Sequence, residues 1–192
     1  QAGFYPWGGS ELVAQLAPGR PAGVNLLDRG PLTRIRGVAG VSGLDRSIAR
    51  RMRRRAENRL EALGVDVAIE EIAWPSHRPG VAIALIAEHE GTVPATFVGL
   101  GERGKPSEAV ADEAVKELLA FEAVPAAVDP HSADQLLLPL ALAPGGSSYT
   151  VSQVTEHLRT NVATIRAFLD RDIRIEEPTN PGEPGRVTMV AT

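Results

Sequence analysis

The sequence predicts an α/β (α+β) protein with two units, and three observations lead to this prediction. Apolar residues alternate with polar ones in several short runs, as in strands, and recur every three or four residues in longer runs, as in helices. Apolar residues make up 43% of the 192 residues and charged residues 23%, which supports a packed core. The pattern changes character near residue 125, where a second unit is expected.

Residues 1–30 are expected to form a turn followed by one strand. The run Pro6-Trp7-Gly8-Gly9 has the composition of a turn. Residues 11–16 alternate between apolar residues and polar or smaller ones, which favours a strand. Prolines and glycines between positions 18 and 23 end this strand.

Residues 31–124 are expected to form a self-contained αβ unit of order β-α-β-β-β-α, a sheet with two helices packed on it. Gly64 is expected to end the first helix as its C-terminal cap. The predicted elements are strands over 32–38, 67–72, 81–88 and 96–100, a helix with the apolar stripe Leu44, Ile48, Met52, Ala56, Leu60 and Leu63, and a helix from Pro106 that buries Val110, Ala114, Val115, Leu118 and Phe121.

Residues 125–192 are expected to form a different unit. Pro139 is expected to distort its first helix. Thr150 and Gln153 fit a capping box at the start of its second helix. The predicted elements are a helix-like run over 131–143, an extended segment over 149–151, a helix over 152–169 and a hairpin with strands beginning at 173 and 187.

Composition excludes several functional classes. The chain has no cysteine, which excludes a thiolate nucleophile, a Cys-ligated metal and Cys-x-x-Cys redox chemistry. The formal net charge of −4 makes any nucleic-acid site a local feature. No signal peptide or membrane-spanning run is visible, so a cytoplasmic location is expected. The chain opens at Gln1 with sequence typical of a domain interior, which predicts a fragment.

His157 is the most promising candidate for a reactive residue. It lies on the predicted helix over 152–169, about 60° to one side of the apolar stripe at 100° per residue. Asn161, four residues later, reaches the same side of the helix. A neutral imidazole is a competent nucleophile near neutral pH. The alternative interpretation is a half-buried surface histidine.

A second candidate is the polar run His131-Ser132-Ala133-Asp134-Gln135, where a predicted helix begins. A helix N-terminus presents free N–H groups that suit a phosphate. The alternative is ordinary helix capping by Ser132 and Asp134. Taken without its context, the run favours ordinary capping.

A cluster of arginines on the first predicted helix has two interpretations. It could bind RNA phosphates. Glu57 and Glu61 lie among the arginines, however, and a solvated helix face is the favoured interpretation. The cluster consists of Arg46, Arg50, Arg51, Arg53, Arg54, Arg55 and Arg59.

Several runs together resemble the RNA 3′-terminal phosphate cyclase family. The run from Ala127 to Ala143 is similar to the family's signature region. Tyr149-Thr150-Val151 followed by His157-Leu158-Arg159-Thr160-Asn161 is similar to its nucleophile helix. Gly3-Phe4-Tyr5-Pro6, with Gly8-Gly9 after it, resembles the turn that opens the family's third structural repeat. The resemblance is strongest over 125–169.

The resemblance implies an enzyme that consumes ATP to convert an RNA 3′-phosphate into a 2′,3′-cyclic phosphate. A histidine, His157 here, would attack the α-phosphate and carry AMP. The run from His131 to Gln135 would contact the nucleotide, with His131 stacking on adenine in place of the family's tyrosine and with Asp134 and Gln135 near the phosphates or a metal. Trp7 and Ser10 depart from the family's Arg and Gly. ATP and a divalent metal, Mg or Mn, are the implied cofactors.

The implied fold is a βαβαββ-repeat cyclase domain with an inserted thioredoxin-like αβ domain. On this map, 1–30 and 125–192 form the discontinuous third repeat and 31–124 form the insert. The implied partners are RNA 3′-phosphate ends and the N-terminal repeats of the same protein, which supply the cationic groups that this chain lacks. The isolated chain is therefore expected to be inactive. The alternative function is a non-catalytic, cyclase-like RNA-binding or ribosome-biogenesis scaffold.

Overall fold

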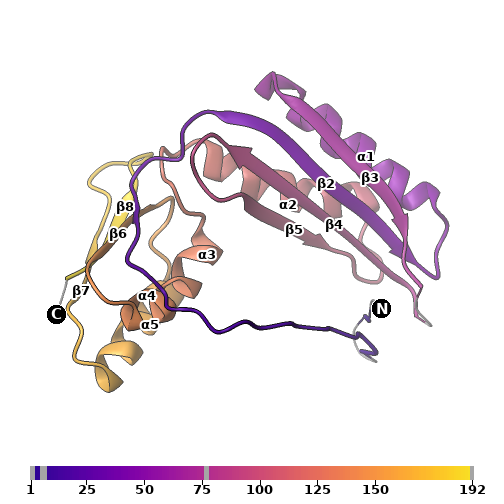
Figure 1. The fold of residues 1–192 in the computed structure, drawn as a ribbon. Coiled ribbons are helices and arrows are strands. Elements are labelled where there is room, and N and C mark those ends of the chain that lie inside the picture. Colours follow the sequence, from indigo (N-terminus) through magenta and orange to yellow (C-terminus); the bar gives the residue numbers. More distant parts are fainter. Residues whose placement is uncertain (1–2, 5–7, 76–77, 191–192) are drawn as a thin grey trace. The chain divides into compact units, whose positions relative to one another are not determined.

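A computed structural model describes residues 3–4, 8–75 and 78–190 (Figure 1). The described residues fold into two compact units. Unit 1 lies within 1–16, 32–89 and 96–119, and unit 2 within 17–31, 90–95 and 120–192. The architecture is mixed α/β, as the sequence predicts, and it contains two four-stranded sheets.

Unit 1 contains the sheet of order β3-β2-β4-β5. Strand β2 lies inside the sheet, where it pairs in parallel with β3 and antiparallel with β4. The expected strands are confirmed, with slightly wider bounds. They are β2 (Leu32–Ser42), β3 (Asp66–Ala73), β4 (Gly80–His89) and β5 (Ala95–Leu100).

Two helices cover one face of this sheet. They are α1 (Ser47–Leu60), extended by the 3-10 turn η1 (Glu61–Leu63), and α2 (Ser107–Glu122). Ion pairs from Arg55 and Arg59 to Asp112 hold α1 beside α2. Gly64 ends the first helix as predicted, because its φ of 68° is left-handed and its N–H donates to the Glu61 carbonyl. The buried helix residues are Ala49, Met52, Ala56 and Leu60 on α1 and Val110, Ala111, Ala114, Val115, Leu118 and Phe121 on α2.

Unit 2 contains the sheet of order β1-β6-β8-β7. Only the β1–β6 pairing is parallel. Its core joins inward residues of the strands, such as Tyr149 and Val187, to helix residues such as Leu158 and Val162. The elements are β1 (Asn25–Leu26), α3 (Pro130–Gln135), α4 (Leu137–Leu142), β6 (Ser147–Val151), α5 (Glu156–Phe168), β7 (Ile173–Glu176) and β8 (Gly185–Met189).

Two helix boundaries in unit 2 differ from the prediction. The run over 131–143 divides at Leu136 into α3 and α4, and Pro139 lies in the first turn of α4, where a missing N–H costs no helical bond. Helix α5 begins after Thr155, whose hydroxyl accepts a hydrogen bond from the Leu158 N–H at 3.1 Å. Thr150 is not a cap. Its hydroxyl accepts from the Ala127 N–H and donates to the Leu27 carbonyl, which fixes it within β6.

The predicted strand over 11–16 is wrong for the described structure. These residues form no strand, and Leu12, Val13 and Leu16 are 91%, 84% and 89% exposed. Alternation alone does not make a strand, because backbone N–H and C=O groups require a neighbouring strand to pair with. Of the turn predicted over 6–9, Pro6 and Trp7 lie outside the described residues. Gly8 and Gly9 have the left-handed φ values of a turn, 63° and 85°.

Two buried arginines close the ends of helices. Arg29 is 8% exposed and donates to carbonyls where α2 ends, at Phe121, Glu122, Val124 and Ala126. Arg171 is 7% exposed and donates to the Ala143 and Gly145 carbonyls, where α4 ends. The last carbonyls of a helix have no partner within the helix, and they carry a partial negative charge. Each arginine therefore supplies donors to carbonyls at or just after the end of a helix, in a largely buried place.

Candidate functional site

The chain before α3 is held against the C-terminal end of strand β6. Val128 forms a parallel bridge with Val151. The Val128 N–H donates to the Thr150 carbonyl, and the Ser152 N–H donates to the Val128 carbonyl, both at 3.1 Å. Because α3 begins two residues after Val128, its N-terminus lies beside the end of β6.

Helix α5 begins near the same end of β6. Strand β6 ends at Val151, and α5 starts at Glu156 after a short connection. The helices α3 and α5 also contact each other. The two runs that the sequence singles out, 131–135 and 157–161, are therefore brought onto neighbouring helices of one unit. This proximity depends on β6 and is not visible from sequence spacing.

His157 is exposed in the first turn of α5. At 100° per residue, Asn161, Thr164 and Phe168 fall within about 40° of it, so the four side chains form one stripe along the helix. All four are exposed, whereas Leu158, Val162 and Ile165 face the core. The imidazole is therefore accessible to a ligand, and the half-buried alternative does not describe it.

The first N–H groups of α3 are already bonded. The side chain of Asp129, 3% exposed, accepts hydrogen bonds from the N–H groups of His131 and Ser132, both at 2.9 Å. Ser132 and Asp134 are thus not the cap, and the capping interpretation holds with Asp129 in that role. An N-cap Asp followed by Pro at the first helical position is a recognised signal, and Asp129-Pro130 could have been read from the sequence.

Tyr149 of strand β6 is hydrogen-bonded to the middle of α3. Its hydroxyl donates to the Ala133 carbonyl at 2.7 Å, and the ring is fully buried. Burial, and to a lesser extent the nearby Asp134 carboxylate, raise the pKa of Tyr149, so that the hydroxyl keeps its proton and remains a donor. Ser132 and Asp134 are half-buried, Ala133 is buried, and His131 and Gln135 are exposed. Among the described residues, no hydrogen bond or ion pair joins Asp134 to His157.

Comparison with known proteins identifies the family. The family model of the RNA 3′-terminal phosphate cyclase insert domain matches residues 27–122. The chain belongs to the RNA 3′-terminal phosphate cyclase family. Proteins named RNA 3′-terminal phosphate cyclase are similar to it over most of its length: one from Nostoc punctiforme is 41% identical over 91% of this chain, and one from Saccharolobus solfataricus is 37% identical over 90%.

This chain spans about half the length of the curated cyclases that it matches. The matched region covers 50% of the Nostoc punctiforme protein and 53% of a 38% identical relative from Gloeothece citriformis. The site described above therefore lies in a region that corresponds to about half of those cyclases.

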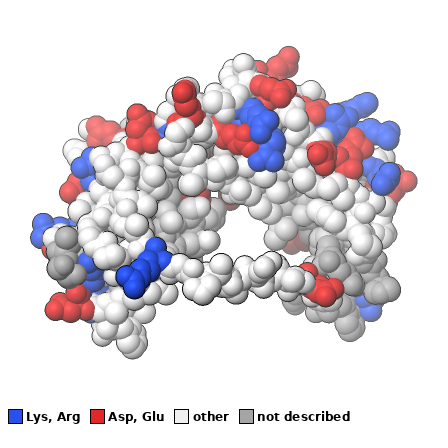
Figure 2. All heavy atoms as spheres, in the orientation of Figure 1, with Lys and Arg blue, Asp and Glu red and all other residues white. Residues whose placement is uncertain are grey.

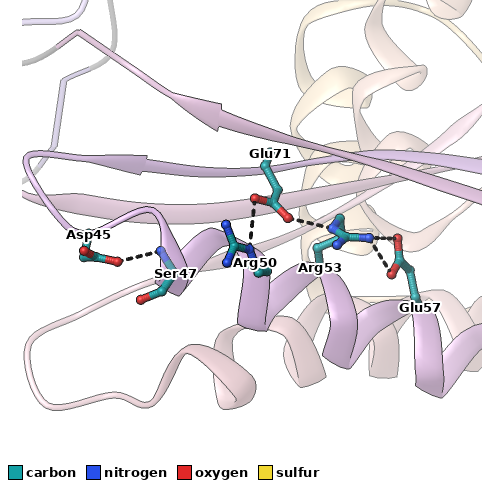
Figure 3. Close-up of polar contacts among 6 residues, drawn as sticks. All are labelled: Asp45, Ser47, Arg50, Arg53, Glu57 and Glu71. Carbon is teal, nitrogen blue, oxygen red and sulfur yellow. Dashed lines mark hydrogen bonds and ion pairs between the residues drawn. The ribbon is translucent and has the colours of Figure 1, made fainter.

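The arginines of the cyclase insert are largely engaged by carboxylates. Arg53 donates to Glu57 and Glu71, and Arg50 lies 3.8 Å from Glu71 (Figure 3). On the face shown in Figure 2, basic and acidic side chains lie intermixed. The arginines of the cluster with a carboxylate partner are Arg50, Arg51, Arg53, Arg55 and Arg59. The solvated helix face is the interpretation that these contacts support.

The arginine nearest to His157 in sequence is engaged by carboxylates. Arg159, two residues away, is bonded to Glu156 and Glu177, and the bond to Glu177 is 3.0 Å long. Within the part of the chain that the structure describes, no three His, Asp or Glu side chains converge as metal ligands do. In that same part, no helix combines the length and the apolar character needed to cross a membrane.

Proposed function

We propose that this chain is part of an ATP-dependent RNA 3′-terminal phosphate cyclase and that His157 carries AMP during the reaction. A ring nitrogen of His157 attacks the α-phosphorus of ATP. An N–P bond forms, the bond to the bridging oxygen breaks, and pyrophosphate leaves. AMP then passes to the RNA 3′-phosphate, and the neighbouring 2′-hydroxyl displaces it as the 2′,3′-cyclic phosphate forms.

The observation that carries the proposal is the exposed position of His157 in the first turn of a thirteen-residue helix, in a chain of this family. The first N–H groups of an α-helix have no partner within the helix and favour an anion nearby. The Leu158 N–H is bonded to the Thr155 hydroxyl, so a phosphate group beside His157 would be stabilised by the N–H groups that precede it, those of Glu156 and His157. The sequence match to the Nostoc punctiforme cyclase covers 91% of this chain and includes this helix.

We further propose that the run from His131 to Gln135 contacts the nucleotide through its side chains. His131 and Gln135 are exposed on a helix that touches α5, which suits a stacking imidazole and an amide near the phosphates. Ser132, Ala133 and Asp134 complete the run. The backbone N–H groups of His131 and Ser132 donate to Asp129, so they are not the donors that bind phosphate.

The described residues do not fit a metal site, since no three ligands converge. We therefore derive no step that involves a metal. The charge that develops on the phosphates requires cationic partners, and these would come from the remainder of a protein about twice this length. In this proposal, 1–30 and 125–192 belong to the third repeat of the cyclase domain and 31–124 are its insert.

The test is covalent labelling of the full-length protein with α-labelled ATP. We expect an adduct that is labile in acid and stable in base, as a phosphoramidate is, and that H157A abolishes. R20A, which alters an exposed arginine far from His157 in the sequence, is the matched control and should label normally. Equal labelling of H157A would overturn the assignment. Absence of label in the unaltered protein, with RNA binding intact, would instead favour the non-catalytic scaffold.

A further inference from the structure

The sheet of unit 1 has one face that the helices do not cover. Alternate residues of β2 point to opposite faces, and Ile35, Ala39 and Val41 are buried on the helix side. Gly40 therefore lies on the other face. Gly80 on β4 lies opposite Ser42, two residues further along β2, so it belongs to this uncovered face as well.

Both glycines lie under an aromatic ring. A Cβ atom added to Gly40 would overlap the six-membered ring of Trp74, and one added to Gly80 would overlap the ring of Phe4. Neither glycine has a left-handed φ, so backbone conformation does not explain them. The absence of a side chain is what allows each ring to contact the sheet at these positions.

The two rings also contact each other. The centroids of Phe4 and Trp74 are 6.1 Å apart with an interplanar angle of 44°, a favourable tilted arrangement. The backbone of Trp74 is held in place because its amide N–H donates to the Val41 carbonyl at 2.8 Å. Phe4 is tied to Gly8, whose backbone N–H donates to the Phe4 carbonyl at 3.1 Å.

We propose that the uncovered face at Gly40, Gly80 and Trp74 is a docking surface for an aromatic side chain and that Phe4 is its occupant within the chain. The surface is built by the β2–β4 sheet, whereas Phe4 comes from a segment that is far away in sequence. Residues 9–22 are exposed, so the ring contact is what fastens Phe4 to this unit. This inference concerns the contact of Phe4 with the sheet of unit 1 and is independent of the chemistry proposed for His157.

The docking can be measured through tryptophan fluorescence. The chain has two tryptophans, Trp7 and Trp74, so that W7F leaves Trp74 as the sole reporter. In this background, F4A should shift the Trp74 emission to longer wavelength and increase its quenching by acrylamide roughly twofold, because a ring that covers it is removed. F4L, which keeps apolar bulk without the ring, should give a smaller change.

A glycine substitution tests the docking surface by changing the sheet instead of Phe4. G80A places a methyl group where the Phe4 ring lies and should reproduce the effect of F4A. G19A is the control, because a Cβ at Gly19 meets nothing within 4 Å, and it should leave emission and quenching unchanged. If G80A fails to fold, as judged by circular dichroism, F4A alone decides. Unchanged emission and quenching in F4A would overturn the proposal.

Discussion

Removal of the Arg29 side chain tests how strongly a buried arginine stabilises the end of a helix. The guanidinium donates to four carbonyls, at 3.1 Å to Phe121, 2.6 Å to Val124, 2.8 Å to Ala126 and 3.1 Å to Glu122. It also lies 3.5 Å from the Glu122 carboxylate and 4.3 Å from the centroid of the Phe121 ring. Burial lowers the pKa of Arg29, while Glu122 and Asp28 raise it. R29A leaves these carbonyls and a partly buried carboxylate without their donor.

The expected loss is large. Removing one partner from a buried charged network typically costs about 3–5 kcal/mol. Proteins are stable by about 5–15 kcal/mol in total, so this change is a large fraction of the free energy of unfolding. With a urea dependence of about 1–3 kcal/mol per molar, the midpoint of unfolding should fall by roughly 1–5 M. R29K retains the charge but not the planar fork of donors, and it should lie between R29A and the unaltered protein.

Urea unfolding followed by far-UV circular dichroism measures this effect. The matched control is R20A, because Arg20 is exposed and its loss should change stability by no more than about 0.5 kcal/mol. A loss below about 1 kcal/mol for R29A would refute the reasoning. Such a result would mean that water or a shifted backbone satisfies the carbonyls at the end of α2.

Two further predictions concern local contacts. T155A removes the hydroxyl that caps α5 and should reduce the free energy of unfolding by about 1 kcal/mol. T150A instead removes contacts of β6 with the backbone at Leu27 and Ala127, so it should not increase fraying of α5. Amide exchange in α5 measures the fraying, and equal fraying in both variants would contradict this prediction. Arg34 and Arg36 hold the pKa of Glu88 below its usual value, so its stabilisation is present above the unfolded pKa and is lost as the pH falls through the lower folded pKa. E88Q should therefore flatten the acid side of a pH–stability curve, and an unchanged curve would argue against these ion pairs.

The predicted and observed folds agree where local chemistry decides the structure. Gly64 ends the first helix because glycine adopts the left-handed backbone conformation without steric cost, and this conformation depends on no residue far away in sequence. The apolar stripe that the sequence assigns to α2 is buried, and so are Met52, Ala56 and Leu60 of the stripe on α1. The rest of the α1 stripe is less buried: Ile48 and Leu63 are half-buried, and Leu44, which lies before α1, is 41% exposed. Patterns that repeat within one element are thus readable from the sequence.

The disagreements occur where a group has a partner far away in sequence. Thr150 matches a capping box locally, yet its hydroxyl is bonded to Ala127 and Leu27, and Thr155 caps α5. Residues 11–16 alternate as a strand does but have no neighbouring strand in the described chain. A local pattern cannot show which competing partner a side chain or a backbone group finds.

For the candidate site, the sequence by itself determined the residue types and their helices: His157 with Asn161 four residues later, and the polar run that begins at His131. Only the tertiary structure decided that both helices begin near the end of β6, through the Val128–Val151 bridge, and that Asp129 already uses the first N–H groups of α3. The physical reason is that helical periodicity is a property of neighbouring residues. The closeness of two helices, and the bonding of their end groups, depend on pairing across the sheet.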